Sequence, residues 1–117
     1  MNIVAGVLVG LVAALHLYFL VLEMFLWTKP TGMRVFGNEP AFAEASKVLA
    51  ANQGLYNGFL VAGLVWGLAD DRTDVQVFFL GCVIVAGLYG AATVSRRILQ
   101  VQALPAALAL VAVLVAS

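Results

Sequence analysis

The sequence predicts an all-α polytopic membrane protein, a four-transmembrane-helix bundle with both termini outside. Hydrophobic residues make up 64% of the 117-residue chain and charged residues only 10%, with a mean hydropathy of +1.07. A soluble domain has about 25% charged residues, and one this small keeps much of its chain at the surface. The apolar residues also form four runs near the length of about 20 residues that a helix needs to cross a bilayer. Apolar surface is therefore expected to face lipid.

The first expected span covers about residues 3–27 and is interrupted only by His16 and Glu23. Residues 28–44 are rich in proline, glycine and charged side chains, which is typical of a loop. The second expected span covers about residues 48–69. Pro40 could open the helix ahead of it, through an amphipathic turn at 41–47, because proline suits a first helical turn.

A short polar turn at 70–74 leads to a third expected span at about 75–95, which Arg96 and Arg97 stop. The fourth, at about 98–116, is the shortest and carries a proline near its start. Four spans use almost the whole length, so residues 1–117 are expected to form a single transmembrane domain.

Basic residues in the connections predict the orientation, because cytoplasmic loops carry an excess of lysine and arginine. The first and third connections share one side, and the second lies on the other. The first and third connections together carry five basic residues, which are Lys29, Arg34, Lys47, Arg96 and Arg97. The second connection carries one, Arg72. This places the loop at 28–44 in the cytoplasm and both termini outside.

Ionisable groups inside a span are costly and mark candidate functional sites. Glu23 lies seven residues after His16, so the two share nearly one helix face, about 10 Å apart along the axis. Glu23 is expected toward the cytoplasmic end of its span.

Polar residues of two further spans are expected at a similar depth. In the second span, Asn52 and Tyr56 form one i,i+4 row, and Gln53 and Asn57 form another beside it. In the third, Tyr89 begins a 4-3-4 series of polar residues that runs through Thr93 and Arg96 to Gln100 and predicts a shared face.

These residues predict an intramembrane polar pocket that faces the cytoplasm, with Glu23 as its acid. Amides and tyrosines would supply neutral hydrogen bonds, and Arg96 a counter-charge. The carboxylate could bind a cationic or amine-bearing ligand, carry a proton or act as a general base. The expected ligand-binding set is Glu23, His16, Asn52, Gln53, Tyr56, Asn57, Tyr89 and Arg96.

Structural interpretations compete with this pocket. Glu23 could form an ion pair with Lys29, Arg96 or Arg97 near the membrane interface. His16 alone favours packing over ligation, since metal sites need several donors. The amides could simply join helices.

No metal, cofactor or nucleic-acid partner is expected, although haem bound through His16 and a quinone bound near the tyrosine, tryptophan and histidine side chains stay open. The chain has one cysteine, Cys82, one histidine and a net charge of zero, which leaves no paired-ligand motif and no basic footprint.

The chain resembles a known family of small bacterial membrane proteins, domain of unknown function 1304. The resemblance covers almost the whole chain and rests above all on LAANQGLYN at 49–57, with LEMF at 22–25, FLGCV at 79–83 and GLYGAAT at 87–93. It implies a four-helix protein of the bacterial inner membrane and supplies no activity.

The expected function is the binding of a small molecule within the bilayer, as a transporter or its binding component. Glycine pairs at 54/58 and 63/67 allow close helix approach and favour a homodimer. An intramembrane enzyme acting on a lipid or hydrophobic substrate is the alternative, as is a ligand-free scaffold. An enzyme is disfavoured, because no nucleophile motif is present and His16 lies far from Glu23 along the helix.

Overall fold

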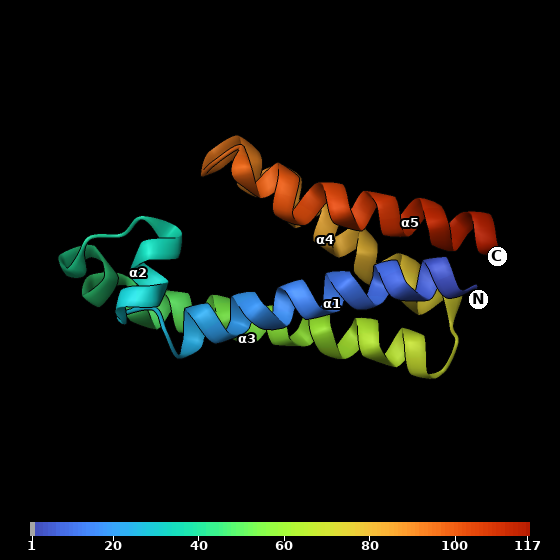
Figure 1. The fold of residues 1–117 in the computed structure, drawn as a ribbon, viewed down its shortest axis with the longest axis horizontal. Helices are drawn as coiled ribbons and strands as arrows, with labels where there is room; N and C mark the ends of the chain where they lie inside the picture. The colour runs from blue at the N-terminus through green and yellow to red at the C-terminus, as the bar shows by residue number, and fades with distance from the viewer. Residues whose placement is uncertain (1) are drawn as a thin grey trace. The chain divides into compact units, whose positions relative to one another are not determined.

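A computed structural model describes residues 2–117, which form helices joined by short turns, with no strand in that range (Figure 1). The elements are α1 (Ile3–Met24), α2 (Pro30–Phe36), α3 (Pro40–Ala69), α4 (Thr73–Thr93), the π-helical segment η1 (Leu99–Ala103) and α5 (Leu104–Ala116). The Asn2 side-chain oxygen accepts the N–H of Ala5 at 2.8 Å and caps the first turn of α1.

Four helical stretches are long and apolar enough to cross a membrane, which confirms the all-helical class and the number of candidate spans. They are Ile3–Met24, Pro40–Ala69, Thr73–Thr93 and Leu99–Ala116, the last being η1 and α5 together. Only 22–28% of each apolar window is buried within the chain. The remaining apolar surface therefore needs lipid or another apolar cover.

The expected loop at 28–44 is wrong in part, because α2 lies inside it, whereas α3 begins at Pro40, the proline that the sequence offered as a helix start. Pro30 and Pro40 each open a helix, where the missing proline N–H costs no hydrogen bond. Gly37 ends α2 with a φ of +68°, a left-handed conformation that glycine adopts without strain.

The chain forms two compact units, which share the long helices α1 and α3. Unit 1 comprises residues 1–14 and 60–117, and unit 2 comprises residues 15–59. The prediction of one transmembrane domain is not tested by this division.

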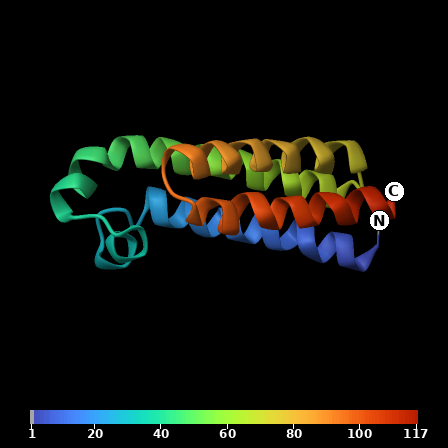
Figure 2. The same ribbon diagram turned by 90° about the horizontal axis from the view of Figure 1, so that it is seen from above.

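Unit 1 is built around an apolar core to which all four long helical stretches contribute. Its buried members repeat at helical spacing: Ala5, Val9, Val12 and Ala13 from α1, Leu64 from α3, Leu80 and Val83 from α4, and Ala106, Ala109 and Val113 from α5. The start of α1, the turn from α3 to α4 and the end of α5 lie at one end of this unit (Figures 1 and 2).

The fourth span is not a regular α-helix throughout. The N–H of Leu104 donates to the carbonyl of Leu99, an i→i−5 bond, just before Pro105. A proline cannot donate to the carbonyl four residues back, and η1 accommodates this loss as a π-helical turn.

Candidate functional site

The buried Glu23 carboxylate is the centre of a polar cluster in unit 2. Glu23 is only 4% exposed. Its Oε2 accepts a hydrogen bond from Gln53 Nε2 at 2.7 Å, and its Oε1 accepts one from Asn57 Nδ2 at 2.5 Å. The donors lie one helical turn apart on α3, 30 and 34 residues away along the chain. The carboxylate is thus held by two neutral amides.

Gly54 explains how α3 comes close enough for these bonds. A Cβ atom at this position would lie 2.6 Å from Met24 Cγ and 3.2 Å from Glu23 Cβ. Only a residue without a side chain therefore lets the two backbones approach here. The Gly54 position thus sets the distance that Gln53 and Asn57 must span.

The homodimer prediction loses the argument that supported it. Gly54 and Gly58 face α1, whereas Gly63 and Gly67 face Phe79 and Gln76 of α4. Both pairs thus pack against other helices of the same chain, so neither pair is left open for a second copy.

No basic side chain of unit 2 neutralises Glu23. Within residues 15–59, Lys47 forms an ion pair with Glu44 at 2.5 Å, and neither Lys29 nor Arg34 is paired with Glu23. Arg96 and Arg97 belong to unit 1, so their pairing with Glu23 stays a prediction.

A groove of about 310 Å³ opens beside the carboxylate. It is lined by the end of α1, the residues that follow it and one face of α3: Glu23, Met24, Phe25, Trp27, Thr28, Lys47, Val48 and Ala51. Most of this lining is apolar. The groove therefore presents a single buried carboxylate to an apolar space.

Trp27 is a fixed part of that wall. Its indole Nε1–H donates to Ser46 Oγ at 3.0 Å, and its ring lies 4.9 Å from the ring of Phe36, centroid to centroid. Ser46 Oγ itself donates to the carbonyl of Phe42 at 2.7 Å. The orientation of the indole is thus set by both α2 and α3.

The other expected residues of unit 2 lie outside the groove lining. Asn52 and Tyr56 are exposed, because their row on α3 lies beside the row that faces Glu23. His16 is fully buried, with its ring edge-on to Phe19 at 5.4 Å between centroids. Of the eight expected ligand-binding residues, the structure brings together Glu23, Gln53 and Asn57.

The shared face expected for the third span is wrong beyond Thr93. That face requires one continuous helix, but α4 ends at Thr93, and the Thr93 hydroxyl donates to the carbonyl of Tyr89 at 2.7 Å. Arg96 lies in the following turn and is exposed, and Tyr89 is 72% exposed. Both belong to unit 1, so their part in the Glu23 site stays a prediction.

The groove residues Met24, Phe25, Thr28, Lys47, Val48 and Ala51 were not expected as site residues. Apolar side chains in a span carry no sign of what they line. Trp27 was not in the expected set either, and its position four residues after Glu23, near the expected membrane interface, was the one available signal.

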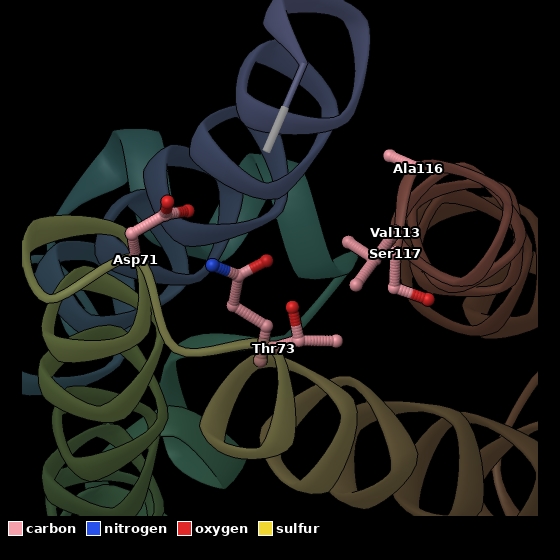
Figure 3. Close-up of a pocket in the computed structure, with 6 residues that line it drawn as sticks. Asp71, Thr73, Val113, Ala116 and Ser117 are labelled. Carbon is pink, nitrogen blue, oxygen red and sulfur yellow. The ribbon is translucent and has the colours of Figure 1, made fainter.

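Unit 1 holds a smaller cavity of about 80 Å³ around Gln76, at the end of α5 (Figure 3). Gln76 is 1% exposed, and its Nε2 donates to the carbonyl of Gly67 at 2.8 Å. Its Oε1 is buried without a partner among the described residues. No group of three or more His, Cys, Asp or Glu in residues 2–117 could hold a metal ion.

Comparison with known proteins connects the whole chain to one family. The family model of DUF1304, described as a protein of unknown function, matches residues 10–114. The chain belongs to the DUF1304 family. The uncharacterized protein YpaA of Lactococcus lactis subsp. lactis (strain IL1403) is 32% identical over 115 residues, covering 95% of this chain and 97% of YpaA. No solved structure matches.

The DUF1304 match covers both units and includes Glu23, Gln53 and Asn57. The resemblance inferred from the LAANQGLYN string is thereby confirmed. Membership establishes the family of this helical bundle, and the chemistry of the site rests on its own residues.

Proposed function

We propose that this DUF1304 protein is a multi-pass protein of the bacterial inner membrane that binds a small molecule in the Glu23 groove, as a transporter or its binding component. The observation that carries the proposal is a carboxylate 4% exposed, held by two neutral amides and bordering a groove of about 310 Å³. A buried charge without a neutralising partner is costly, and a ligand offsets that cost.

The other charged residues within the long helices support the choice of Glu23. Glu44 and Lys47 pair with each other, with side chains 64% and 52% exposed. Asp74 pairs with Arg72, and its side chain is 69% exposed. These pairs lie near helix ends, where exposed charged side chains stay solvated and need no ligand.

The groove is proposed to face the cytoplasm, with both termini outside. This rests on the five-to-one distribution of basic residues. Cys82 is the sole cysteine, so Cys82→Ala gives a background for single-cysteine labelling with a membrane-impermeant maleimide. Glu39→Cys should react only after the cells are permeabilised, and Asp70→Cys should react in intact cells. The reverse pattern would invert the topology.

Native mass spectrometry in mild detergent tests the binding function. Wild-type protein should retain a small molecule that Glu23→Gln loses. The variant can still fold, because one flipped amide of Gln53 or Asn57 restores amide–amide hydrogen bonds. Glu39→Gln makes the same change at an exposed position of unit 2 and should retain the molecule.

A ligand-free scaffold is the competing function, favoured by one observation: both Glu23 oxygens already have a partner. In that case wild type and Glu23→Gln give the same ligand-free spectrum, and Glu23→Gln lowers only the thermal stability. That result would remove the binding proposal.

A further inference from the structure

The first argument about the ligand comes from the unused acceptor capacity of Glu23. A carboxylate offers about four lone-pair positions on its two oxygens. Gln53 fills one on Oε2, and Asn57 fills one on Oε1. Because amides are neutral, these bonds leave the negative charge in place. The carboxylate can therefore accept further N–H or O–H donors from the groove side.

The second argument comes from the charges around the groove. Glu23 and Lys47 are the charged residues in its lining. The Lys47 ammonium lies 2.5 Å from Glu44 Oε1, so those two charges offset each other. The groove is left with the charge of Glu23, which attracts a cation and repels an anion.

The third argument comes from the walls. Met24, Phe25, Val48 and Ala51 line the groove with apolar side chains, and Trp27 adds an indole held by Ser46. Tryptophan is the aromatic side chain that binds cations best through its ring face. Hard metal cations instead favour oxygen-rich sites, and Glu23 supplies the one carboxylate of this mostly apolar lining. The occupant that matches is organic.

We propose that the ligand of the Glu23 groove is a protonated amine with an apolar body. Its ammonium donates to the Glu23 carboxylate, and its body lies against Trp27 and the apolar wall. This inference rests on the proposed binding function and narrows it to one ligand class.

Isothermal titration calorimetry on the full chain in mild detergent tests the ligand class with three probes of matched shape. These are phenethylammonium, the neutral 2-phenylethanol and the anionic phenylacetate. Phenethylammonium should bind at least about tenfold more tightly than 2-phenylethanol, since hydrogen bonds to a charged group are the stronger ones. Phenylacetate should not bind. Equal binding of amine and alcohol, or tighter binding of phenylacetate, overturns the amine.

Substitution of Glu23 should remove that preference. Glu23→Gln is expected to weaken phenethylammonium binding by about 10- to 100-fold and to leave 2-phenylethanol binding nearly unchanged. Glu39→Gln, the matched exposed control, should bind as wild type does. An amine preference that survives in Glu23→Gln places the cation elsewhere and overturns the inference.

Substitutions of two exposed residues, Lys47 and Glu44, are expected to change amine binding in opposite directions. Neither substitution alters a buried side chain. Lys47→Gln removes a positive charge from the lining and should strengthen phenethylammonium binding by about two- to fivefold. Glu44→Gln releases Lys47 from its ion pair and should weaken binding by a similar factor. An anion site would show both effects with reversed sign, which would overturn the inference.

Failure of the inference can be told from failure of the proposed function. If none of the three probes binds, the native mass spectrum decides. A Glu23-dependent molecule that is not basic overturns the amine and leaves the binding function standing. A wild-type protein that binds no probe and retains no molecule overturns both.

Discussion

The two units place a buried polar side chain against α3 in the same way and use it differently. In unit 2, Glu23 lies beside Gly54 of α3, and in unit 1, Gln76 lies beside Gly67. Glu23 accepts two amide hydrogen bonds and borders a groove of about 310 Å³. Gln76 donates one bond to a backbone carbonyl and borders a cavity of about 80 Å³.

The difference lies in charge and in space. An amide inside a membrane protein joins helices at low cost, because it carries no charge and needs few partners. An ionised carboxylate is not neutralised by bonds from two neutral amides, so it can still bind a cation. Unit 1 adds a ten-residue apolar core, whereas unit 2 adds an apolar groove. Packing thus dominates unit 1, whereas ligand binding is the role that we propose for unit 2.

The largest expected effect is a loss of stability when the apolar core of unit 1 is disturbed. Leu80→Ala removes a fully buried side chain from the core and should lower the free energy of unfolding by about 2–4 kcal/mol. The loss is expected in the lower part of the usual range for such substitutions. Lipid solvates an unpacked apolar side chain much better than water does, so less is lost when the side chain is removed from the core. Thermal unfolding in detergent measures the loss. Below its melting temperature the variant should still retain the ligand. Loss of the ligand there would show that binding in unit 2 depends on the core of unit 1.

The next effect concerns the close approach in unit 2. Gly54→Val forces side-chain atoms toward Met24 and Glu23 and should cost about 1–3 kcal/mol by overpacking, together with the bound ligand. Gly81→Ala is the matched control, because a Cβ there meets nothing within 4 Å. That control should be neutral or slightly stabilising, since alanine favours helix more than glycine does. Equal melting temperatures for both variants would contradict the close approach.

The two amide donors of Glu23 should differ in weight. Asn57 is 9% exposed, whereas Gln53 is exposed, so solvent or lipid headgroups can replace Gln53 more easily. Asn57→Ala should cost about 1–2 kcal/mol of stability, and Gln53→Ala about half as much. Urea or thermal unfolding of the two variants tests this order. A larger loss for Gln53→Ala would contradict it.

The smallest effect is expected at Gln76. Gln76→Leu removes the bond to Gly67 and also removes the buried Oε1, which has no partner within residues 2–117. The two changes oppose each other, so the stability should shift by less than about 1 kcal/mol. Thermal unfolding measures this shift, and phenethylammonium binding should stay unchanged. A loss as large as that of Asn57→Ala would mean that Gln76 has a partner of its own.

Local sequence patterns predicted the long helices well and their ends poorly. Four apolar runs give four long helical stretches. The expected span at 3–27 ends at Met24, and α3 begins eight residues before the expected start at 48. Hydropathy reports which residues tolerate lipid, whereas backbone hydrogen bonds decide where a helix ends. For this reason α2 appeared inside an expected loop.

The candidate site was predictable only where one helix carried it. Glu23 stands out in the sequence as an acid within an apolar run. Its donors, Gln53 and Asn57, were named within a larger set that also contained Asn52 and Tyr56. Spacing along α3 predicts two adjacent rows but not which row faces α1. The rotation of α3, fixed by packing at Gly54, makes that choice.

The sequence by itself determined the class of this protein, its four long apolar helices and the one carboxylate within an apolar run, Glu23. The class follows from composition. The helices and the position of the carboxylate follow from the spacing of residues over one or two helical turns. Only the tertiary structure decided that Glu23 is held by two amides 30 and 34 residues away, and that a groove lined by the end of α1 and one face of α3 opens beside it. Such pairings depend on the rotation and separation of helices, and those are set by packing between distant parts of the chain.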